Sequence, residues 1–201
     1  MPHPSTRIRA ALLAPLAAIA LSACGVNSVP TAEETAKARW ADVQNEYQRR
    51  ADLIPNLVAT VKGYARQEQD VLTQVTQARA SATAIRVSVD DPRSLEKFGQ
   101  AQGELSAALG RLMSVTENYP DLKSNTNFLA LQATLEGTEN RIGIARRDYN
   151  EAVQAYNTRI RTFPDAIGAK IFYGAKPMPP FEATTPGAQT APTITFDPKA
   201  G

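Results

Sequence analysis

Apolar residues recur in alternating steps of three and four along most of this chain, and no other feature constrains its fold as strongly. The rhythm runs without a slip over residues 40–85, and it returns over residues 95–119 and 128–156. A period between 3.5 and 3.6 puts one side chain per turn on the same face of a helix, which is typical of long helices packed in a bundle. We therefore expect an all-α protein.

The prolines indicate where these helices end. Asp91-Pro92, Tyr119-Pro120 and Phe163-Pro164 all lie at or near the edges of the periodic runs. Pro55 instead lies inside the first run, which keeps its register on both sides of the proline. We predict a helix that continues through Pro55 with a kink, because proline cannot donate its hydrogen bond and clashes one turn back. A break at Pro55 into two helices is the alternative.

The expected architecture is an up-and-down, antiparallel bundle of three long helices. The links around residues 88–92 and 120–124 are short, which favours antiparallel neighbours. The first helix, counted as two halves about Pro55, makes four helical segments. Asp91 before Pro92 is typical of a helix start, and Ser124 or Asn125 is a good N-cap for the last long helix, of about 40 residues.

The N-terminus has the pattern of an export signal. Two arginines precede an apolar run over residues 10–23, and Cys24 follows directly. Fourteen residues span roughly 21 Å as a helix, which is shorter than a hydrocarbon core of about 30 Å, so a signal peptide is favoured over a membrane-spanning helix. The junction Leu21-Ser22-Ala23-Cys24 resembles the lipobox of bacterial lipoproteins, which implies cleavage before Cys24 and acylation of that residue. An ordinary signal peptide with a stray cysteine is the alternative.

Four regions follow from this pattern. Residues 1–23 are the signal peptide, 24–30 a tether, 31–174 the helical body and 175–201 a proline-rich tail. Six prolines in the tail exclude a helix and favour an extended or disordered segment. Within the tail, residues 177–181 are interpreted as a linker or a strap across the body, or else as an extended segment that binds a partner.

Composition excludes several classes of site. His3 is the single histidine and Cys24 the single cysteine, so the body lacks both residue types. This excludes Ser-His-Asp and Cys-His catalysis, and it makes the usual zinc sites and other metal sites unexpected. Without the two leader arginines, the 22 basic and 20 acidic residues balance, and nothing marks a nucleic-acid-binding protein. We expect no cofactor.

Four motifs in order carry a family resemblance. The chain contains RRADLIPNLV with VKGY over residues 49–64, YPDLKSN with NFL over 119–129, TENRI with AR over 138–146, and then YN, YN and FP between 149 and 164. Together these stretches resemble the LemA family across roughly residues 39–182. The resemblance implies a helical bundle held at a membrane by its N-terminus, and it implies no defined molecular activity. The lipoprotein-like signal and the tail beyond Glu182 depart from the family pattern.

Two charged residues occupy positions in the first apolar run. Arg50 and Glu68 each fall where the rhythm requires an inward-facing side chain. The structural interpretation is an ion pair, buried or half-buried, to another helix, because charged side chains are rarely buried alone. Glu139 and Arg141 lie beside the third seam and are candidate partners. A polar site inside the bundle is the alternative.

A set of polar residues near Pro55, Pro120 and the third motif forms the candidate site. Its members, proposed as a partner-binding or structural polar cluster, are Arg50, Asp52, Asn56, Glu68, Asp121, Lys123, Asn125, Glu139, Asn140 and Arg141. Asp and Asn near chain reversals are often caps and turns, which is the structural alternative. Carboxylates can perform acid–base chemistry without histidine, but nothing in the sequence fixes a pair at a working separation.

These observations predict an exported, membrane-anchored envelope lipoprotein. Lipid on Cys24 would hold it at the periplasmic face, with Gly25 favouring the outer over the inner membrane by resemblance to lipoprotein sorting rules. The expected role is a non-enzymatic scaffold or adaptor that binds another envelope protein. Binding of a lipid or small ligand within the bundle is the alternative, and a carboxylate-based envelope hydrolase is a further one.

Overall fold

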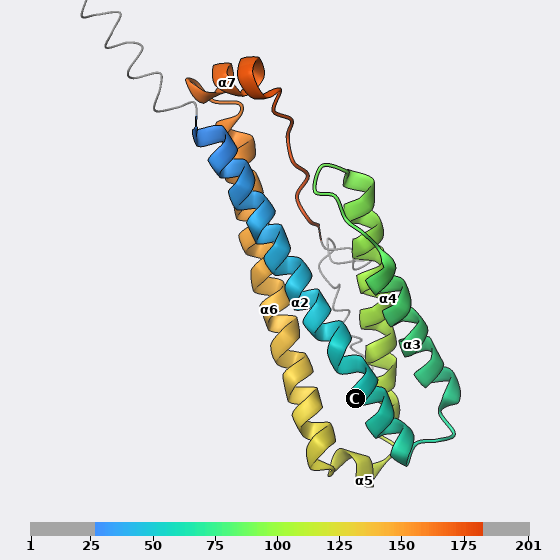
Figure 1. Ribbon diagram of the computed structural model, residues 1–201. Helices are drawn as coiled ribbons and strands as arrows, with labels where there is room; N and C mark the ends of the chain where they lie inside the picture. The colour runs from blue at the N-terminus through green and yellow to red at the C-terminus, as the bar shows by residue number, and fades with distance from the viewer. Residues whose placement is uncertain (1–26, 183–201) are drawn as a thin grey trace, which may run out of the picture. The chain divides into compact units, whose positions relative to one another are not determined.

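The computed structural model describes residues 27–182, and its regular elements are all helical (Figure 1). In chain order they are α2 (Ser28–Tyr64), α3 (Gln69–Ala84), α4 (Pro92–Thr116), α5 (Pro120–Lys123), α6 (Thr126–Arg159), α7 (Asp165–Gly168) and the π-helical turn η1 (Ala169–Tyr173). The all-α prediction is confirmed for this range. The signal peptide, Cys24 and the tail beyond Glu182 lie outside the described residues. None of the helices within residues 27–182 is both long and apolar enough to cross a membrane.

The described chain divides into two compact units. The first unit holds the part of α2 up to Asp52 together with Gln132–Pro180, which includes most of α6, α7 and η1. The second unit holds Leu53–Leu131, which includes α3 and α4 packed against each other, and continues from Phe181. Helices α2 and α6 each run through the division without interruption.

Helix α2 continues through Pro55, as the unbroken register of the apolar run predicts. The helix is 37 residues long and contains Pro55 in its interior. Ile54 and Leu57 on either side are 1% and 2% exposed, so their packing offsets the hydrogen bond that proline cannot donate. The alternative of a break at Pro55 is wrong.

The chain does break within the first periodic run, one residue after Gly63. Helix α2 ends at Tyr64 and α3 begins at Gln69, so the run predicted as one helix forms two. The seam slips there as well, because Tyr64 is 44% exposed and Ala65 is buried in its place. Glycine is among the weakest helix formers, and the space around Gly63 is open, so packing does not compensate for it. Residues 27–182 therefore contain four long helices where three were predicted.

Helix α4 follows its sequence pattern throughout. Asp91 is the N-cap, with its Oδ1 accepting from the backbone N–H of Arg93 at 3.0 Å, and Pro92 occupies the first turn. The predicted seam is buried at every position within the helix, namely Leu95, Phe98, Gln102, Leu105, Leu109, Leu112 and Thr116. The cap and the apolar stripe agree, so local and long-range preferences specify the same helix.

Helix α6 begins where an N-cap was expected and is shorter than predicted. Asn125 Oδ1 accepts from the backbone N–H of Phe128 at 3.0 Å, which satisfies one donor of the first turn. The helix has 34 residues and ends at Arg159, four residues before the predicted end at Phe163. Its buried seam residues are Phe128, Leu135, Thr138, Ile142, Ala145, Tyr149 and Tyr156.

Replacement of Asn125 by alanine is expected to destabilise the protein by about 1 kcal/mol, because the Phe128 N–H loses its acceptor. Asn125 also donates from Nδ2 to the Tyr64 hydroxyl at 2.9 Å, so Asn125→Asp separates the two roles by keeping the cap and removing the donor. Chemical unfolding followed by circular dichroism measures both variants. Equal losses in the two variants would show that the contact with Tyr64, rather than the cap, is the stabilising interaction.

Candidate functional site

The first unit contains a buried arginine that joins α2 to α6. Arg50 is 1% exposed, and its Nη1 lies 2.5 Å from Glu139 Oε1. Its guanidinium carbon also lies 5.1 Å from the centre of the Tyr47 ring, within range of a cation–π interaction. The seam position of Arg50 turns it inward, and Glu139 meets it from beside the seam of α6. This is the ion pair to another helix that the register predicted.

Tyr47 has the electrostatics of a buried phenol next to cations. Burial raises its pKa above the ordinary value, because the phenolate would lose hydration, and the nearby Arg146 and Arg50 oppose that shift. Tyr47 is therefore neutral at physiological pH. Together with Arg50 it gives the first unit a polar layer within an otherwise apolar seam.

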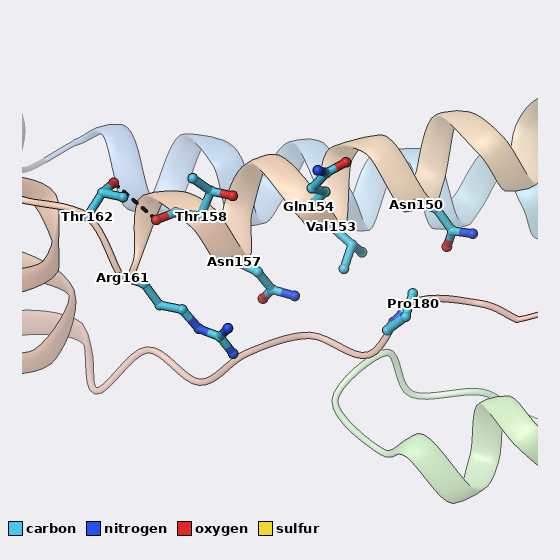
Figure 2. A pocket seen from close by; sticks show the side chains of 8 residues that line it. All are labelled: Asn150, Val153, Gln154, Asn157, Thr158, Arg161, Thr162 and Pro180. Atoms are coloured by element: carbon cyan, nitrogen blue, oxygen red, sulfur yellow. Dashed lines mark hydrogen bonds between the residues drawn. The ribbon is translucent and has the colours of Figure 1, made fainter.

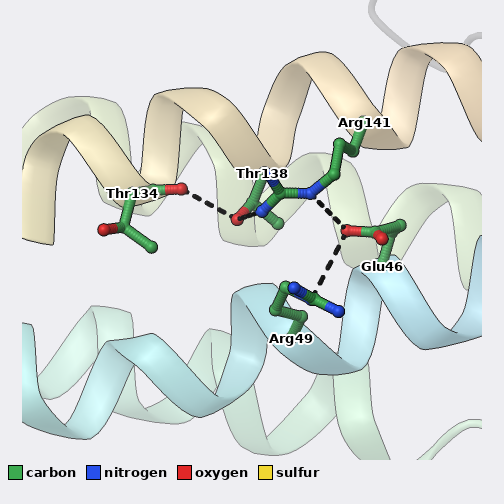
Figure 3. Close-up of polar contacts among 5 residues, drawn as sticks. All are labelled: Glu46, Arg49, Thr134, Thr138 and Arg141. Atoms are coloured by element: carbon green, nitrogen blue, oxygen red, sulfur yellow. Dashed lines mark hydrogen bonds and ion pairs between the residues drawn. The ribbon is translucent and has the colours of Figure 1, made fainter.

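A second polar network lies on the outer edge of the same two helices (Figure 3). Glu46 Oε2 accepts from Arg141 Nε at 3.0 Å and lies 3.7 Å from Arg49 Nε. Arg141 Nη2 donates to Thr138 Oγ1 at 2.9 Å, and the Thr138 hydroxyl donates to the carbonyl oxygen of Thr134 at 2.8 Å. One carboxylate of α2 thus faces two arginines, one from each helix.

This network borders a groove of about 370 Å³ in the first unit. The residues lining it are Asp42, Asn45, Glu46, Arg49, Arg141, Ile144, Ala145 and Asp148. Ile144 is 50% exposed, so the groove offers an apolar side chain among charges of both signs. Of the lining residues, the sequence analysis had singled out only Arg141. The signal that could have found the others is the recurrence of polar residues at 42, 45–46 and 49, which follow the helical period beside the seam.

Two other predicted site residues of the first unit are exposed. Asp52 Oδ1 accepts from Gln48 Nε2 at 2.8 Å within α2, and Asn140 lies on the exposed side of α6. Five of the ten candidates therefore belong to this unit. Three of the five, Arg50, Glu139 and Arg141, make contacts between α2 and α6.

The remaining candidates belong to the second unit, where most of them serve local structure. Glu68 is half-buried, and its Oε1 accepts from the Tyr119 hydroxyl at 2.8 Å rather than facing a cation. Lys123 forms an exposed ion pair with Glu117. Asn125 is the cap of α6, while Asn56 and Asp121 are exposed. The residues predicted as one cluster are thus divided between two units.

The Tyr119–Glu68 contact predicts a pH dependence. The hydrogen bond to the Glu68 carboxylate raises the pKa of Tyr119 above its ordinary value of 10.0. Because the folded pKa is raised, the contribution of this bond to stability is complete below pH 10 and is lost as the pH rises through the raised pKa. In Glu68→Ala the Tyr119 pKa is expected to fall towards its ordinary value, as measured by NMR titration of ¹³C-labelled tyrosine.

The matched control for this titration is Glu117→Ala. Glu117 lies two residues from Tyr119 and pairs with Lys123 instead. If Glu117→Ala lowers the Tyr119 pKa as much as Glu68→Ala does, the general acidic charge of the region raises the pKa, and the specific hydrogen bond is not its cause.

An extended segment after η1 lies along α6 and is held by polar side chains. Asn157 donates from Nδ2 to the carbonyl oxygen of Met178 at 2.8 Å, and its Oδ1 accepts from the Met178 N–H at 2.9 Å. The hydroxyls of Tyr149 and Tyr156 donate to the carbonyl oxygens of Pro179 and Lys176, both at 3.1 Å. Residues 175–180 are called the strap below. The side chains of α6 thus supply hydrogen-bond partners to strap backbone groups that a helix or sheet would otherwise supply.

Beside the strap, α6 forms one side of a second groove of about 460 Å³ (Figure 2). Its lining is mostly amides and hydroxyls, with Arg161 as the single charged residue, and comprises Asn150, Val153, Gln154, Asn157, Thr158, Arg161, Thr162 and Pro180. The sequence analysis missed Asn157 as a contact residue. Its position directly after Tyr156, in the second of two Tyr-Asn pairs, is the signal that was available.

The carboxylates considered for acid–base chemistry have identified contacts. Glu139 faces Arg50, Glu68 faces Tyr119 and Asp52 accepts from Gln48. Within residues 27–182, no group of three or more His, Cys, Asp or Glu side chains is placed to hold a metal ion. The contact of Glu139 therefore joins two helices, and the contacts of Glu68 and Asp52 are hydrogen bonds within their own units.

Comparison with known proteins agrees with the motifs. Magnetosome protein MamQ 2 of Paramagnetospirillum magneticum is 27% identical over 172 residues, which cover 76% of this chain and 63% of the relative. Magnetosome protein MamQ of Magnetospirillum gryphiswaldense is 25% identical over 157 residues, 69% of this chain and 58% of the relative. Protein LemA of Metamycoplasma hominis is 30% identical over 118 residues, 59% of this chain and 51% of the relative. The chain thus spans less than two thirds of the length of each of these relatives.

Residues 39–196 match the model of the LemA family. The matched range begins one residue before Trp40 and includes α2 from that point, α3 to α7, the π-helical turn η1 and the strap. It therefore includes both the buried Arg50–Glu139 pair and the contacts of Asn157 with Met178. With all four motifs and more than half of the sequence inside the match, the chain belongs to the LemA family.

Proposed function

We propose that this LemA-family chain is an exported lipoprotein, held at the periplasmic face of the cell envelope by lipid on Cys24, with the outer membrane favoured by Gly25. The proposal is supported by the apolar run of 14 residues and the Leu-Ser-Ala-Cys junction. Helix α2 begins at Ser28, only four residues after Cys24, so the helical body starts close to the anchor. More than one acyl chain is needed for stable anchoring, and lipoprotein processing supplies it.

The anchored body acts as a non-enzymatic adaptor that binds another envelope protein. The observation that carries this role is the groove of Glu46, Arg49, Arg141 and Ile144, where α2 and α6 present charges of both signs around an exposed apolar side chain. Arginine surrounding a small apolar centre is a composition typical of protein interfaces.

The charges at this groove are available to a partner. The Arg141 side chain is 44% exposed and the Arg49 side chain is 61% exposed, so their ion pairs with Glu46 contribute at most about 1 kcal/mol each. A partner carboxylate can take the place of Glu46 at small cost. The buried Arg50–Glu139 pair beneath fixes the two helices and keeps the groove in shape.

Photo-crosslinking in cells tests the adaptor role. A photoreactive residue in place of Asn45, which is exposed and lines the groove, is expected to give one dominant protein adduct. The same residue in place of Gln100, which is exposed on α4, is the control and is expected to give none. Adducts of equal yield at both positions, or none at Asn45, contradict the adaptor role.

A charge exchange separates recognition from structure. Glu46→Arg and Arg141→Glu each remove the contact between the two helices, whereas the double variant restores it with the charges reversed. We expect the Asn45 adduct to be lost in all three variants, because the partner meets the wrong charges. Recovery of the adduct in the double variant would show that the pair only supports the fold.

The anchor has its own test. Cells that are fed an alkyne-labelled fatty acid are expected to label the wild-type protein and not Cys24→Ser, which should leave the membrane fraction. Equal labelling of the two, or membrane retention of the variant, contradicts lipidation of Cys24.

The groove beside the strap supports a second candidate function, the binding of a small ligand. Its volume of about 460 Å³ is within the range of small-molecule sites, and its amides and hydroxyls can donate and accept hydrogen bonds. A rise in the melting temperature with an envelope lipid extract, abolished by Gln154→Ala, supports this function. Crosslinking from Asn45 to lipid alone, with no protein adduct, would favour it over the adaptor role.

A further inference from the structure

Exposed large apolar side chains gather in one short stretch of the first unit. Of the eight such residues in the described range, five lie between positions 163 and 173. Phe163 is 81% exposed, Ile171 and Phe172 are each 68%, Ile167 is 53% and Tyr173 is 42%. A contiguous apolar surface of this kind marks an interaction site on a protein that otherwise buries such residues.

Helical spacing puts two of these residues on one face. Ile167 in α7 and Ile171 in η1 are four positions apart and therefore share a helix face. Phe172 lies against Gly168, with its Cδ2 4.0 Å from where a Cβ would be, so its ring packs beside the backbone of α7. The set of Phe163, Ile167, Ile171, Phe172 and Tyr173 is called the apolar tip below.

Helix α7 lies beside the start of α2 (Figure 1). Ser28 Oγ donates to Asp165 Oδ2 at 2.8 Å, and Arg159 Nη1 donates to the Ser28 carbonyl oxygen at 3.4 Å. Cys24 is four residues before Ser28, which is at most about 14 Å of extended chain. Lipid on Cys24 therefore brings the membrane surface within that distance of α7.

The charges around the tip fit an anionic surface. Residues 159–176 contain four cations, Arg159, Arg161, Lys170 and Lys176, and a single acid. That acid, Asp165, lies 3.8 Å from Arg159 Nε and accepts from Ser28, so its charge is already opposed. Aromatic and apolar side chains flanked by Lys and Arg are typical of segments that lie in the lipid headgroup region.

We propose that the apolar tip inserts into the headgroup region of the membrane to which Cys24 is anchored, so that the protein has two attachments to one lipid surface. The proposal rests on the lipid anchor of the proposed function. The acyl chains hold the protein at the membrane, and the tip orients its first unit there. Neither α7 nor η1 spans the bilayer, because together they have nine residues.

Quenching by brominated lipid tests the insertion. The processed, acylated full-length protein carrying Phe172→Trp is reconstituted into vesicles of phosphatidylethanolamine and phosphatidylglycerol, with and without brominated acyl chains. We expect the added tryptophan to lose about half of its emission to the brominated lipid, because interfacial side chains reach 5–10 Å into the headgroup boundary. The native Trp40 is 4% exposed, and the parent protein supplies its baseline.

Leu129→Trp is the matched control, because Leu129 is 49% exposed at the opposite end of α6 from Arg159. No quenching is expected there. Adding Ile167→Asp and Ile171→Asp to Phe172→Trp should abolish the quenching while the far-ultraviolet circular dichroism stays unchanged.

Each contrary outcome has a distinct meaning. If the protein is acylated and bound to vesicles, but Phe172→Trp is quenched no more than Leu129→Trp, the insertion is overturned and the anchor is not. A protein whose mass lacks acyl chains and which separates from the vesicles overturns the anchor, and the two-point attachment with it. Blue-shifted emission of Phe172→Trp without vesicles overturns the insertion too, because another part of the chain or a second copy then covers the tip.

Discussion

Glu139→Ala is expected to cost about 3 kcal/mol of folding stability and to be among the most damaging single changes at a charged residue. The substitution removes the carboxylate 2.5 Å from the guanidinium of Arg50, which is 1% exposed. Removal of one partner from a buried pair leaves the other charge in a low-dielectric surrounding, which typically costs 3–5 kcal/mol. The lower end applies because Glu139 itself is 46% exposed and water reaches the pair from its side.

The reverse deletion is expected to be milder. Arg50→Met keeps an unbranched apolar side chain in the seam and leaves behind only a carboxylate that can be hydrated. Replacement of a buried charge by an apolar residue of similar size is often close to neutral when the partner is not stranded. We therefore expect a loss of about 1 kcal/mol, part of it from the Tyr47 ring, which loses the guanidinium 5.1 Å from its centre.

Urea unfolding at pH 7, followed by circular dichroism, measures both variants. Glu136→Ala on the same helix is the matched control, since Glu136 is exposed and bonds only to Gln132 one turn away. It is expected to change stability by less than about 0.5 kcal/mol. If Arg50→Met lowers the free energy of unfolding more than Glu139→Ala does, the packing of the arginine stem, and not its charge, stabilises the two helices.

The part of the fold that sequence reasoning predicted best is α4. Its cap, first-turn proline and seven buried seam residues follow from local pattern alone, and each specifies the same helix. The Arg50–Glu139 pair was also within reach, because a charged residue at a seam position needs a partner from a facing helix. The register of two separate runs supplied the candidates, Glu139 and Arg141, and the structure assigns Glu139 to Arg50 and Arg141 to Glu46.

The break between α2 and α3 could not be read from periodicity. The apolar rhythm continues through residues 64–69 although the helix does not, since a chain can leave the helix and resume with a compatible spacing. Pro55 looked like the greater disruption, yet buried neighbours stabilise the helix there, and the open surroundings of Gly63 offer no such help. Tertiary packing thus overrides the local propensity at Pro55, whereas the weak helix propensity of Gly63 goes uncompensated.

Some residues of the predicted polar cluster make contacts between helices, but the ten residues do not form one group. Proximity in sequence to Pro55 and Pro120 suggested one cluster, whereas the residues fall into two units. Glu46 and Asn157, which organise the grooves and the strap, lie outside all the polar positions that the sequence analysis selected. Such side chains acquire a role only through partners 21 to 95 residues away, and a single sequence carries little signal for contacts of that range.

Tyr149→Ala is expected to cost about 4 kcal/mol, the largest loss among the substitutions considered. Tyr149 is fully buried, and its ring packs edge-on against Trp40 with 5.2 Å between the centroids. Truncation of a buried aromatic side chain removes its transfer free energy and leaves a cavity, which together typically cost 3–5 kcal/mol. The measurement is the same urea unfolding as for the charged pair.

Tyr149→Phe isolates the role of the hydroxyl in holding the strap. It keeps the ring against Trp40 and removes the hydrogen bond to the Pro179 carbonyl oxygen, so we expect a loss of only about 1 kcal/mol. The local effect should be larger than the global one, with faster amide hydrogen exchange at Met178 while the core of α6 stays protected. If exchange at Met178 is unchanged, the Asn157 contacts alone hold the strap, and Asn157→Ala should then release it. If instead exchange rises equally along α6, the strap and the helix unfold as one cooperative element, and the strap is part of the folded body.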